Sequence, residues 1–297
     1  MFLKPKRNKE ISLLIPIRNL CSNKCIFCAR GNRKECIESD YKEIIKSLSE
    51  YNLEDFTRAQ IGGDEPLNFH SIKKLIRYLK IKDFKKICIK TVGRKISDIK
   101  LLKELIELGV SDFELPLYGS TDIIHDSITR VKGSFNEVVK GIQNLIKLNI
   151  YFKLHTIILK QNLENLYDLI DFAQKEFNKN IKLILLFPDS KNAREYQECA
   201  PRLSNIPQKL LKKTELYLPC INYHLDRSFT DLYKAYNKRV GQAPLRDQQN
   251  MHKLDTCKKC IYFEMCDGYY LQYFKLYGTE EFKPIQKKVS ILRRLFK

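Results

Sequence analysis

The sequence predicts an α/β protein built from repeated strand–helix units, and three observations lead to this fold class. Between residue 11 and about residue 187, short β-branched or aromatic runs alternate with stretches of helical periodicity. Six such units can be counted, and no seventh or eighth follows them. The strand segments are nearly continuous in apolar character, as expected of strands buried on both faces. A partial (β/α) barrel and an open doubly wound sheet both fit this pattern.

Each unit is recognised by a strand segment and by signals at the ends of the helix that follows it. Asp40 with Glu43, and Ser134 with Glu137, have the spacing of capping boxes at helix starts. Gly109 stands just past the third helical stretch, where a left-handed residue commonly ends a helix. The expected strands are Ile11–Ile17, Phe56–Ile61, Lys86–Lys90, Asp112–Tyr118, Ile150–Ile158 and Ile181–Phe187.

The composition is typical of a globular protein, but it does not identify a binding partner. With 297 residues and 43% hydrophobic content, the chain is long enough to bury a full core. A net charge of +19 would favour phosphates, carboxylates or membrane surfaces, although solvated lysine-rich helix faces explain it equally well. The apolar run at Ile11–Ile17 is too short for a signal peptide or a transmembrane span. We therefore expect a cytoplasmic protein, in which ten cysteines indicate metal binding rather than disulfides.

A second region is expected after the repeated units, because their regularity fades beyond Phe187. We place one domain at residues 1–200 and another at 201–297, which holds four of the ten cysteines and many aromatic residues. The last segment, 283–297, has apolar residues at helical spacing and is expected to form a basic amphipathic helix that packs on the protein.

A three-cysteine motif directly follows the first strand. Cys21, Cys25 and Cys28 form C-x3-C-x2-C, and thiolates are the preferred ligands of iron–sulfur clusters. A four-iron cluster usually takes four thiolates, so three leave one iron open for a substrate or cofactor. A zinc site is the competing interpretation, but zinc requires a fourth close ligand.

The segment from Asn19 to Cys28 resembles the signature of the radical S-adenosylmethionine (SAM) superfamily, including an aromatic residue, Phe27, before the third cysteine. This resemblance implies a partial (β/α)6 TIM-like barrel and a [4Fe–4S] cluster whose open iron binds SAM. It also implies an external electron donor such as flavodoxin or ferredoxin. Reductive cleavage of SAM would then produce a 5′-deoxyadenosyl radical that abstracts a substrate hydrogen.

A glycine pair after the second strand extends the resemblance. Gly62, Gly63, Asp64, Glu65 and Pro66 are similar to the family's Gly-Gly-Glu-Pro turn, whose backbone receives the SAM ammonium group. Two glycines allow a ligand to approach the backbone closely. One extra acidic residue stands before the proline, so either carboxylate can occupy the family's glutamate position.

Three further cofactor-binding residues are implied by the resemblance. Thr91 begins Thr-Val-Gly after the third strand, where the family has Thr-Asn-Gly. Arg130 matches an arginine that commonly binds the SAM carboxylate, a role suited to a fork of fixed donors. Asn162 matches a family asparagine near the ribose, or it caps a helix. Pro116 stands where relatives often have a SAM-contacting serine, so that contact is not expected here.

A second cysteine group lies near the C-terminus. Cys257, Cys260 and Cys266 form C-x2-C-x5-C, and Cys220 upstream makes four thiolates available for one closed site. The arrangement resembles the twitch domain, a shortened SPASM domain, which implies an auxiliary [4Fe–4S] cluster. Zinc remains the alternative because all four ligands would be used.

The remaining cysteines have simpler interpretations. Cys88 falls within an expected strand and should be a small buried apolar residue. Cys36 and Cys199 are expected in loops, where a free thiol is the default and a hydrogen donor is the less common role. The sequence reveals no catalytic acid–base residue.

The resemblance implies an enzyme that oxidatively modifies a peptide or protein side chain. Against this, a first strand near Ile11 leaves no room for the N-terminal peptide-recognition domain of many such enzymes. The alternative is rearrangement or cyclisation of a nucleotide or another small metabolite, as in the molybdopterin-precursor cyclase. A redox sensor or nucleic-acid-binding iron–sulfur protein is not favoured, because the residues above resemble a SAM site. Such a protein would show no SAM turnover, whereas both enzyme interpretations predict 5′-deoxyadenosine.

Overall fold

The computed structural model describes residues 11–28, 38–187, 193–214, 218–222 and 251–286. It divides the chain into two compact units. The first comprises residues 1–157 and 164–182, and the second comprises 158–163 and 183–297. The boundary expected at residue 200 remains a prediction about domains.

A six-stranded sheet with the order β1-β2-β3-β4-β5-β6 organises the first unit. Strands β1 to β5 pair in parallel and β6 continues the sheet, which confirms the expected α/β fold with a partial barrel of six strand–helix units. The strands are β1 (Ser12–Ile17), β2 (Arg58–Gly63), β3 (Lys86–Lys90), β4 (Asp112–Pro116), β5 (Tyr151–Ile158) and β6 (Ile181–Leu185).

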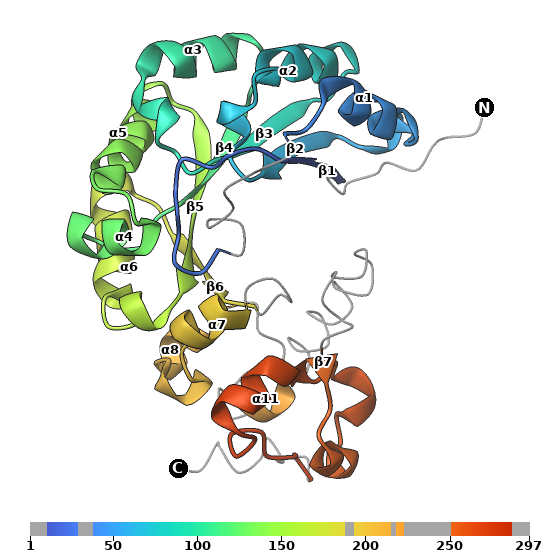
Figure 1. Ribbon diagram of the computed structural model, residues 1–297, viewed down its shortest axis with the longest axis vertical. Helices are drawn as coiled ribbons and strands as arrows, with labels where there is room; N and C mark the ends of the chain where they lie inside the picture. The colour runs from blue at the N-terminus through green and yellow to red at the C-terminus, as the bar shows by residue number, and fades with distance from the viewer. Residues whose placement is uncertain (1–10, 29–37, 188–192, 215–217, 223–250, 287–297) are drawn as a thin grey trace, which may run out of the picture. The chain divides into compact units, whose positions relative to one another are not determined.

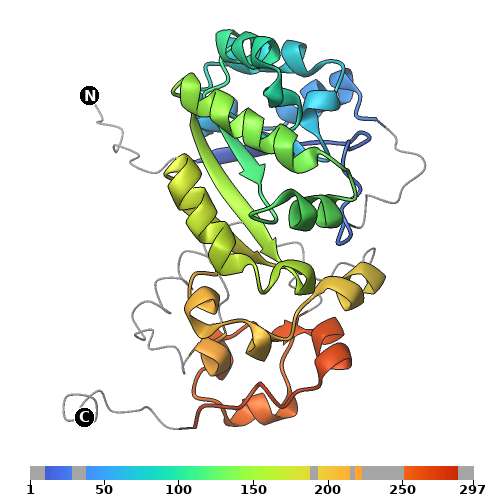
Figure 2. The ribbon, with the colours of Figure 1, turned by 90° about the vertical axis from the view of Figure 1, so that its left-hand side faces the viewer.

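The helices of the first unit form an outer layer over one face of this sheet (Figure 1). Seen from that side, they lie in front of the strands (Figure 2). Their inward positions bury apolar side chains completely, including Leu75 of α2, Leu105 of α3 and Ile142 of α5. The helices are α1 (Tyr41–Ser49), α2 (Ile72–Ile81), α3 (Ile99–Glu107), α4 (Asp122–Thr129), α5 (Ser134–Lys147) and α6 (Leu166–Phe177).

Two of the three helix-end signals predicted from the sequence are confirmed. Asp40 caps α1 by accepting from the backbone N–H groups of Lys42 and Glu43. Gly109 follows α3 with φ of 110°, a conformation that favours glycine. The capping box at Ser134 was wrong: Ser134 lies inside α5, and the Asp126 carboxylate binds the Ser134 hydroxyl at 2.8 Å.

The two faces of the sheet differ, which corrects the expectation of strands that are apolar on both faces. In β4, Phe113 and Leu115 are fully buried, whereas the alternate residues Asp112 and Glu114 carry charge. Because alternate residues of a strand point to opposite faces, the polar residues share the face away from the helices. We call this the inner face of the sheet.

The second unit contains short elements around an aromatic core. Tyr273 is 1% exposed, and its ring centroid lies 5.1 Å from that of Tyr269 and 5.7 Å from that of Phe282. Strands β7 and β8 pair antiparallel. The elements are α7 (Ala193–Cys199), α8 (Gln208–Leu211), α9 (Pro219–Asn222), β7 (Met251–His252), β8 (Tyr269–Tyr270) and α11 (Leu271–Tyr277).

The structure corrects two expectations for the second unit. Cys199 ends helix α7 and is buried, so it does not lie in a loop as expected. Residues 283–286 are not helical, although Ile285 is buried and its carbonyl accepts from Ile261 N–H at 2.9 Å. The rest of the expected C-terminal helix, and Cys36, lie outside the described residues. Within the described ranges, no helix is long and apolar enough to cross a membrane.

Candidate metal centre and cofactor site

The loop after β1 carries the first three cysteines and is held against the end of α4. Lys24 N–H donates to the carbonyl of Thr129 at 2.9 Å, and Ile26 N–H donates to that of Ile128, also at 2.9 Å. We call residues 21–28 the cluster loop. Its backbone is thereby anchored one residue before Arg130.

Arg94 braces the same loop from the end of β3. Its Nη1 donates to the Ser22 carbonyl at 2.8 Å and contacts Asn23 Oδ1 at 3.3 Å, while Nε pairs with Glu137 of α5. Sequence reasoning missed this residue. The available signal was its position directly after Thr91-Val92-Gly93, which the resemblance places at the cofactor.

The thiols of the cluster loop are partly buried and lie close enough to influence one another. The pKa of Cys21 is raised to about 11, chiefly by burial and also by the nearby Glu65 and Cys28, although the hydrogen bond from Asn23 N–H opposes the rise. The pKa of Cys25 is also raised by burial and by its two cysteine neighbours. Grouped thiolates repel each other, and binding to iron removes this penalty. The donor set therefore fits an iron–sulfur cluster.

Aromatic side chains enclose this cysteine group. The ring of Phe27 packs edge-on against Tyr118, with 5.4 Å between centroids, and Tyr118 in turn lies 5.5 Å from His125. Burial raises the Tyr118 pKa well above its usual value, and the three thiols of the cluster loop raise it further. Tyr118 is thus a neighbour of the cysteines that sequence analysis had not placed at the site.

The glycine turn after β2 requires glycine on geometric grounds. Gly63 has φ of 121°, and a Cβ built on it would lie 2.1 Å from the Ile17 carbonyl oxygen. A side chain at this position would therefore collide with β1. At Gly62, a Cβ would lie 3.4 Å from Lys90 Cδ, so this residue leaves room for a lysine from β3.

The structure distinguishes the two acidic residues of the turn. Glu65 is 1% exposed, and its carboxylate accepts from the Thr91 hydroxyl at 2.7 Å and from Val92 N–H at 2.8 Å. Burial raises the Glu65 pKa, partly offset by these hydrogen bonds. Asp64, in contrast, accepts from Asn19 N–H at 3.1 Å.

Asn19 joins the turn to the cluster loop. Its Nδ2 donates to the Glu65 carbonyl at 2.6 Å, and its Oδ1 accepts from Glu65 N–H at 3.0 Å. Asn19 is 6% exposed and stands two residues before Cys21. The structure therefore brings together the cysteine motif, the glycine turn and Thr91, and it shows Thr91 bonded to Glu65. Pro66 is buried and begins a short 3-10 helix, Pro66–Asn68.

The other two expected cofactor residues have different surroundings. Arg130 is exposed and adopts a left-handed conformation with φ of 55° directly after α4. Asn162 is 1% exposed in the second unit, and its Oδ1 accepts from Leu159 N–H at 2.9 Å. That bond is the local capping contact weighed above as the alternative to a ribose contact.

The second cysteine group also comes together. Cys220, Cys257, Cys260 and Cys266 line one pocket of the second unit, together with Phe263 and Phe282. The Cys220 pKa is raised to about 12, chiefly by burial and also by the other three cysteines. Among the described residues, no group of three or more His, Cys, Asp or Glu side chains forms a site for a single metal ion.

Comparison with known families decides the assignment. A model of the radical SAM superfamily matches residues 15–173, more than half of the chain. The chain belongs to the radical SAM superfamily. The family supports SAM and one [4Fe–4S] cluster as cofactors.

Curated relatives of this radical SAM protein are distant. A probable GTP 3′,8-cyclase of Sulfurisphaera tokodaii is 25% identical over 232 residues, covering 75% of this chain and 72% of the relative. An Fe-coproporphyrin III synthase of Methanosarcina barkeri is 25% identical over 161 residues, covering 52% of this chain and 39% of the relative.

Solved structures support the fold. The enzyme anSMEcpe with bound AdoMet has a TM-score of 0.56 at 13% identity, covering 92% of this chain and 93% of that one. Streptococcus suis SuiB bound to S-adenosylmethionine has a TM-score of 0.55 at 16% identity, covering 93% and 76%. At these identities the likeness concerns architecture alone.

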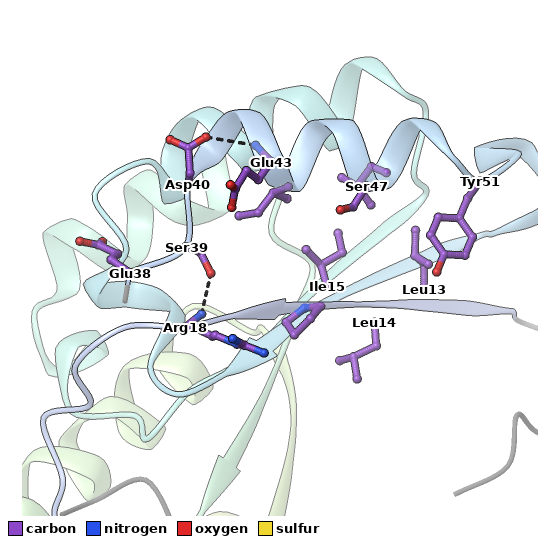
Figure 3. Close-up of a pocket in the computed structure, with 13 residues that line it drawn as sticks. Leu13, Leu14, Ile15, Arg18, Glu38, Ser39, Asp40, Glu43, Ser47 and Tyr51 are labelled. Atoms are coloured by element: carbon purple, nitrogen blue, oxygen red, sulfur yellow. Dashed lines mark hydrogen bonds between the residues drawn. The ribbon is translucent and has the colours of Figure 1, made fainter. Parts of the chain in front are cut away.

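A separate cavity of about 360 Å³ lies between β1 and α1 of this radical SAM protein (Figure 3). Its floor is apolar, with Leu13 and Ile15 of β1 beneath the helix, and its rim carries the carboxylates of Glu38 and Glu43. No residue of the cysteine motifs or of the glycine turn lines it. The cavity is therefore distinct from the cofactor site.

Proposed function

We propose that Cys21, Cys25 and Cys28 hold the [4Fe–4S] cluster that binds SAM. The observation that carries the proposal is the pair of hydrogen bonds between Asn19 and the Glu65 backbone, since they join the cysteine loop to the glycine turn. When bound, the cluster and SAM supply a 5′-deoxyadenosyl radical. The protein's part is to hold the two cofactors in register and to keep water away.

The residues around the cluster loop and the glycine turn have separate roles in this proposal. Gly62 and Gly63 allow SAM to approach the backbone at the end of β2, and Glu65 with Thr91 holds that turn rigid. Arg130, next to the anchored cluster loop, receives the SAM carboxylate. We keep Asn162 as a proposed ribose contact, although its cap bond to Leu159 explains its burial without a ligand. Phe27 shields the cluster through its packing on Tyr118.

We further propose an auxiliary [4Fe–4S] cluster on Cys220, Cys257, Cys260 and Cys266, in a twitch-like domain. Their common pocket and their mutual effect on the Cys220 pKa support this. A cluster there would accept the electron left on a substrate radical, making the overall reaction oxidative.

Oxidative modification of a peptide or protein side chain is the substrate proposal. Its support is the structural likeness to anSMEcpe with bound AdoMet and Kp18Cys peptide, at a TM-score of 0.54. The second candidate is radical rearrangement or cyclisation of a nucleotide or small metabolite, favoured by relatives named probable GTP 3′,8-cyclase. An external donor such as flavodoxin or ferredoxin would deliver the reducing electron in either case.

The test is SAM cleavage by anaerobically reconstituted protein with a chemical reductant. We expect 5′-deoxyadenosine from the unaltered protein and none from a variant with Cys21, Cys25 and Cys28 all changed to Ala, which should also lose one cluster. Cys88→Ala is the matched control, because Cys88 is a fully buried cysteine of the same unit outside the motif. Sustained 5′-deoxyadenosine formation by the triple variant would contradict the assignment.

A further inference from the structure

The inner face of the sheet carries a charged row below the cofactor site. Glu114 of β4 lies between Lys90 of β3 and Lys153 of β5, its register partners on the two sides. Lys90 Nζ is 3.2 Å from Glu114 Oε2, and the Glu114 side chain is 17% exposed. Phe152 and Leu154, which flank Lys153, are buried on the helix side, so Lys153 shares the inner face with Glu114.

Cations exceed carboxylates on this face. The charged residues on the strands of this face include five cations, Arg58, Lys86, Lys90, Lys153 and Lys182, and two carboxylates, Asp112 and Glu114, a difference of 5 − 2 = +3. Arg58 pairs with the buried Asp112 at the start of the strands, and its Nη2 also lies 3.7 Å from Glu114 Oε1. Glu114 is therefore shared by Arg58 and Lys90, and the other lysines of the face add to its positive field.

A neutral histidine completes the row. His155 of β5 is half-buried and lies near Glu114, Lys90 and Lys182. Burial lowers its pKa to about 4, an effect that Glu114 opposes and the lysines reinforce. At neutral pH the ring is thus uncharged and adds hydrogen-bonding capacity rather than charge.

The row lies directly beneath the proposed SAM site. Lys90 immediately precedes Thr91, and Thr91 N–H donates to the Glu114 carbonyl at 3.1 Å. Leu117 N–H donates to the His155 carbonyl at 2.9 Å. Gly62 of the cofactor turn neighbours the stem of Lys90, since a Cβ built on Gly62 would lie 3.4 Å from Lys90 Cδ. A molecule bound on this face would therefore be adjacent to SAM.

We propose that the inner face binds an anionic group of the substrate, a carboxylate or a phosphate, between Lys90 and Lys153. Lys182 adds to the positive field, His155 offers a hydrogen bond, and Glu114 positions Lys90. A bound anion would add negative charge to a face on which cations outnumber carboxylates on the strands. The inference rests on the proposed function and specifies the chemistry of its substrate.

The experiment is equilibrium binding to the reconstituted holoprotein with SAM, using two probes: inorganic tripolyphosphate and a tetraglutamate peptide. We expect at least one probe to bind in a salt-dependent manner. Lys90→Met and Lys153→Met should each weaken that binding at least tenfold, and Lys153→Glu should weaken it more. Lys147→Met is the matched control on the outer helix α5 and should bind as the unaltered protein does.

The two probes distinguish a phosphate from a carboxylate, and a separate measurement tests the proposed function. Tighter binding of tripolyphosphate identifies a phosphate group, and tighter binding of the peptide identifies carboxylates; both support an anion site. Failure of both probes to bind, or equal affinity in the Lys90 and Lys153 variants, overturns it. Cluster absorbance and 5′-deoxyadenosine formation are measured on the same samples. If the unaltered protein shows neither cluster absorbance nor 5′-deoxyadenosine formation, the proposed function is contradicted. The binding measurements would still test the anion site independently.

Discussion

At the scale of single residues, Arg130 combines a proposed ligand role with an uncommon backbone conformation. Its φ of 55° is left-handed, a region that costs most residues other than Gly and Asn free energy. The neighbouring carbonyls of Ile128 and Thr129 hold the cluster loop, so this conformation directs the chain immediately beside the three cysteines. In the proposed complex, the guanidinium of this exposed residue would receive the SAM carboxylate.

We therefore predict that Arg130→Asn weakens SAM binding without unfolding the protein. Asn tolerates the left-handed backbone but removes the fork of donors. Losing a charge-assisted hydrogen bond costs about 1.5–3 kcal/mol, which corresponds to a rise in Kd on the order of 10- to 100-fold. Isothermal titration of SAM on reconstituted protein measures the effect. Arg130→Lys should recover little of it, since a point charge does not reproduce the fork.

Lys132→Asn, a change at an exposed lysine in the following turn, is the control and should leave SAM affinity unchanged. If Arg130→Asn keeps both its cluster content and the original affinity, the proposed carboxylate contact is wrong.

At the scale of elements, the loop after β3 holds the other cofactor loops in place. Arg94 donates to the cluster loop, and Lys95 Nζ donates to the Leu67 carbonyl beyond the glycine turn at 3.0 Å. Asn144 of α5 donates to the carbonyls of Ile96 and Ser97, both at 3.0 Å. One loop thus links the ends of β1, β2 and β3 to a long outer helix. Through these hydrogen bonds, α5 supports the loop that contacts the other cofactor loops.

Removing the Arg94 brace should loosen the cluster loop before it affects the sheet. Arg94→Met keeps the aliphatic stem and deletes the donors to Ser22 and Asn23. We expect faster loss of the cluster to an iron chelator. The free energy of unfolding should fall by about 1.5–3 kcal/mol, the range for hydrogen bonds to charged groups.

The measurements are the decay of cluster absorbance after chelator addition and denaturant unfolding. Arg77→Met, at an exposed arginine of α2, is the control. A cluster lifetime in Arg94→Met equal to that of the control would show that Arg94 is not needed to hold the loop.

At the scale of the whole molecule, each compact unit gathers its own set of cysteines. The first set lies on one short loop, whereas the second is assembled from separate segments, with Cys220 on α9 and Cys266 before β8. In the aromatic core of the same unit, the Tyr273 hydroxyl accepts from Leu203 N–H at 2.7 Å and pairs with Glu281, so this core also joins segments that are distant in the sequence. Formation of the second site therefore depends on the tertiary fold of its unit.

Two clusters predict about eight iron atoms per chain after reconstitution. Cys220→Ser should lower this to about four, because a closed site loses one of its four thiolates, while SAM still binds to the first cluster. Elemental analysis for iron and zinc on the same samples measures both metals. Cys199→Ala, at a buried cysteine outside the pocket, should retain the full iron content. Stoichiometric zinc in the unaltered protein would favour the zinc alternative.

The sequence by itself determined the features that depend on local order. Six strand–helix units were visible from periodicity, and every expected strand overlaps an observed one within two residues at each end. Cysteine spacing and the glycine turn were readable because their chemistry requires particular residue types close together in the chain. The Asp40 cap was correct for the same reason, since a cap acts within one helical turn.

Only the tertiary structure decided which distant residues meet. It selected Glu65 as the buried carboxylate, because Asn19 and Thr91, 46 and 26 residues away, supply its partners. It revealed Arg94, whose partners on the cluster loop are more than 70 residues distant. Strand register likewise set Lys90 and Lys153 on either side of Glu114 and gave the sheet a charged inner face. Periodicity records which face a residue occupies, whereas register determines its neighbours, and register depends on the packing of the whole sheet.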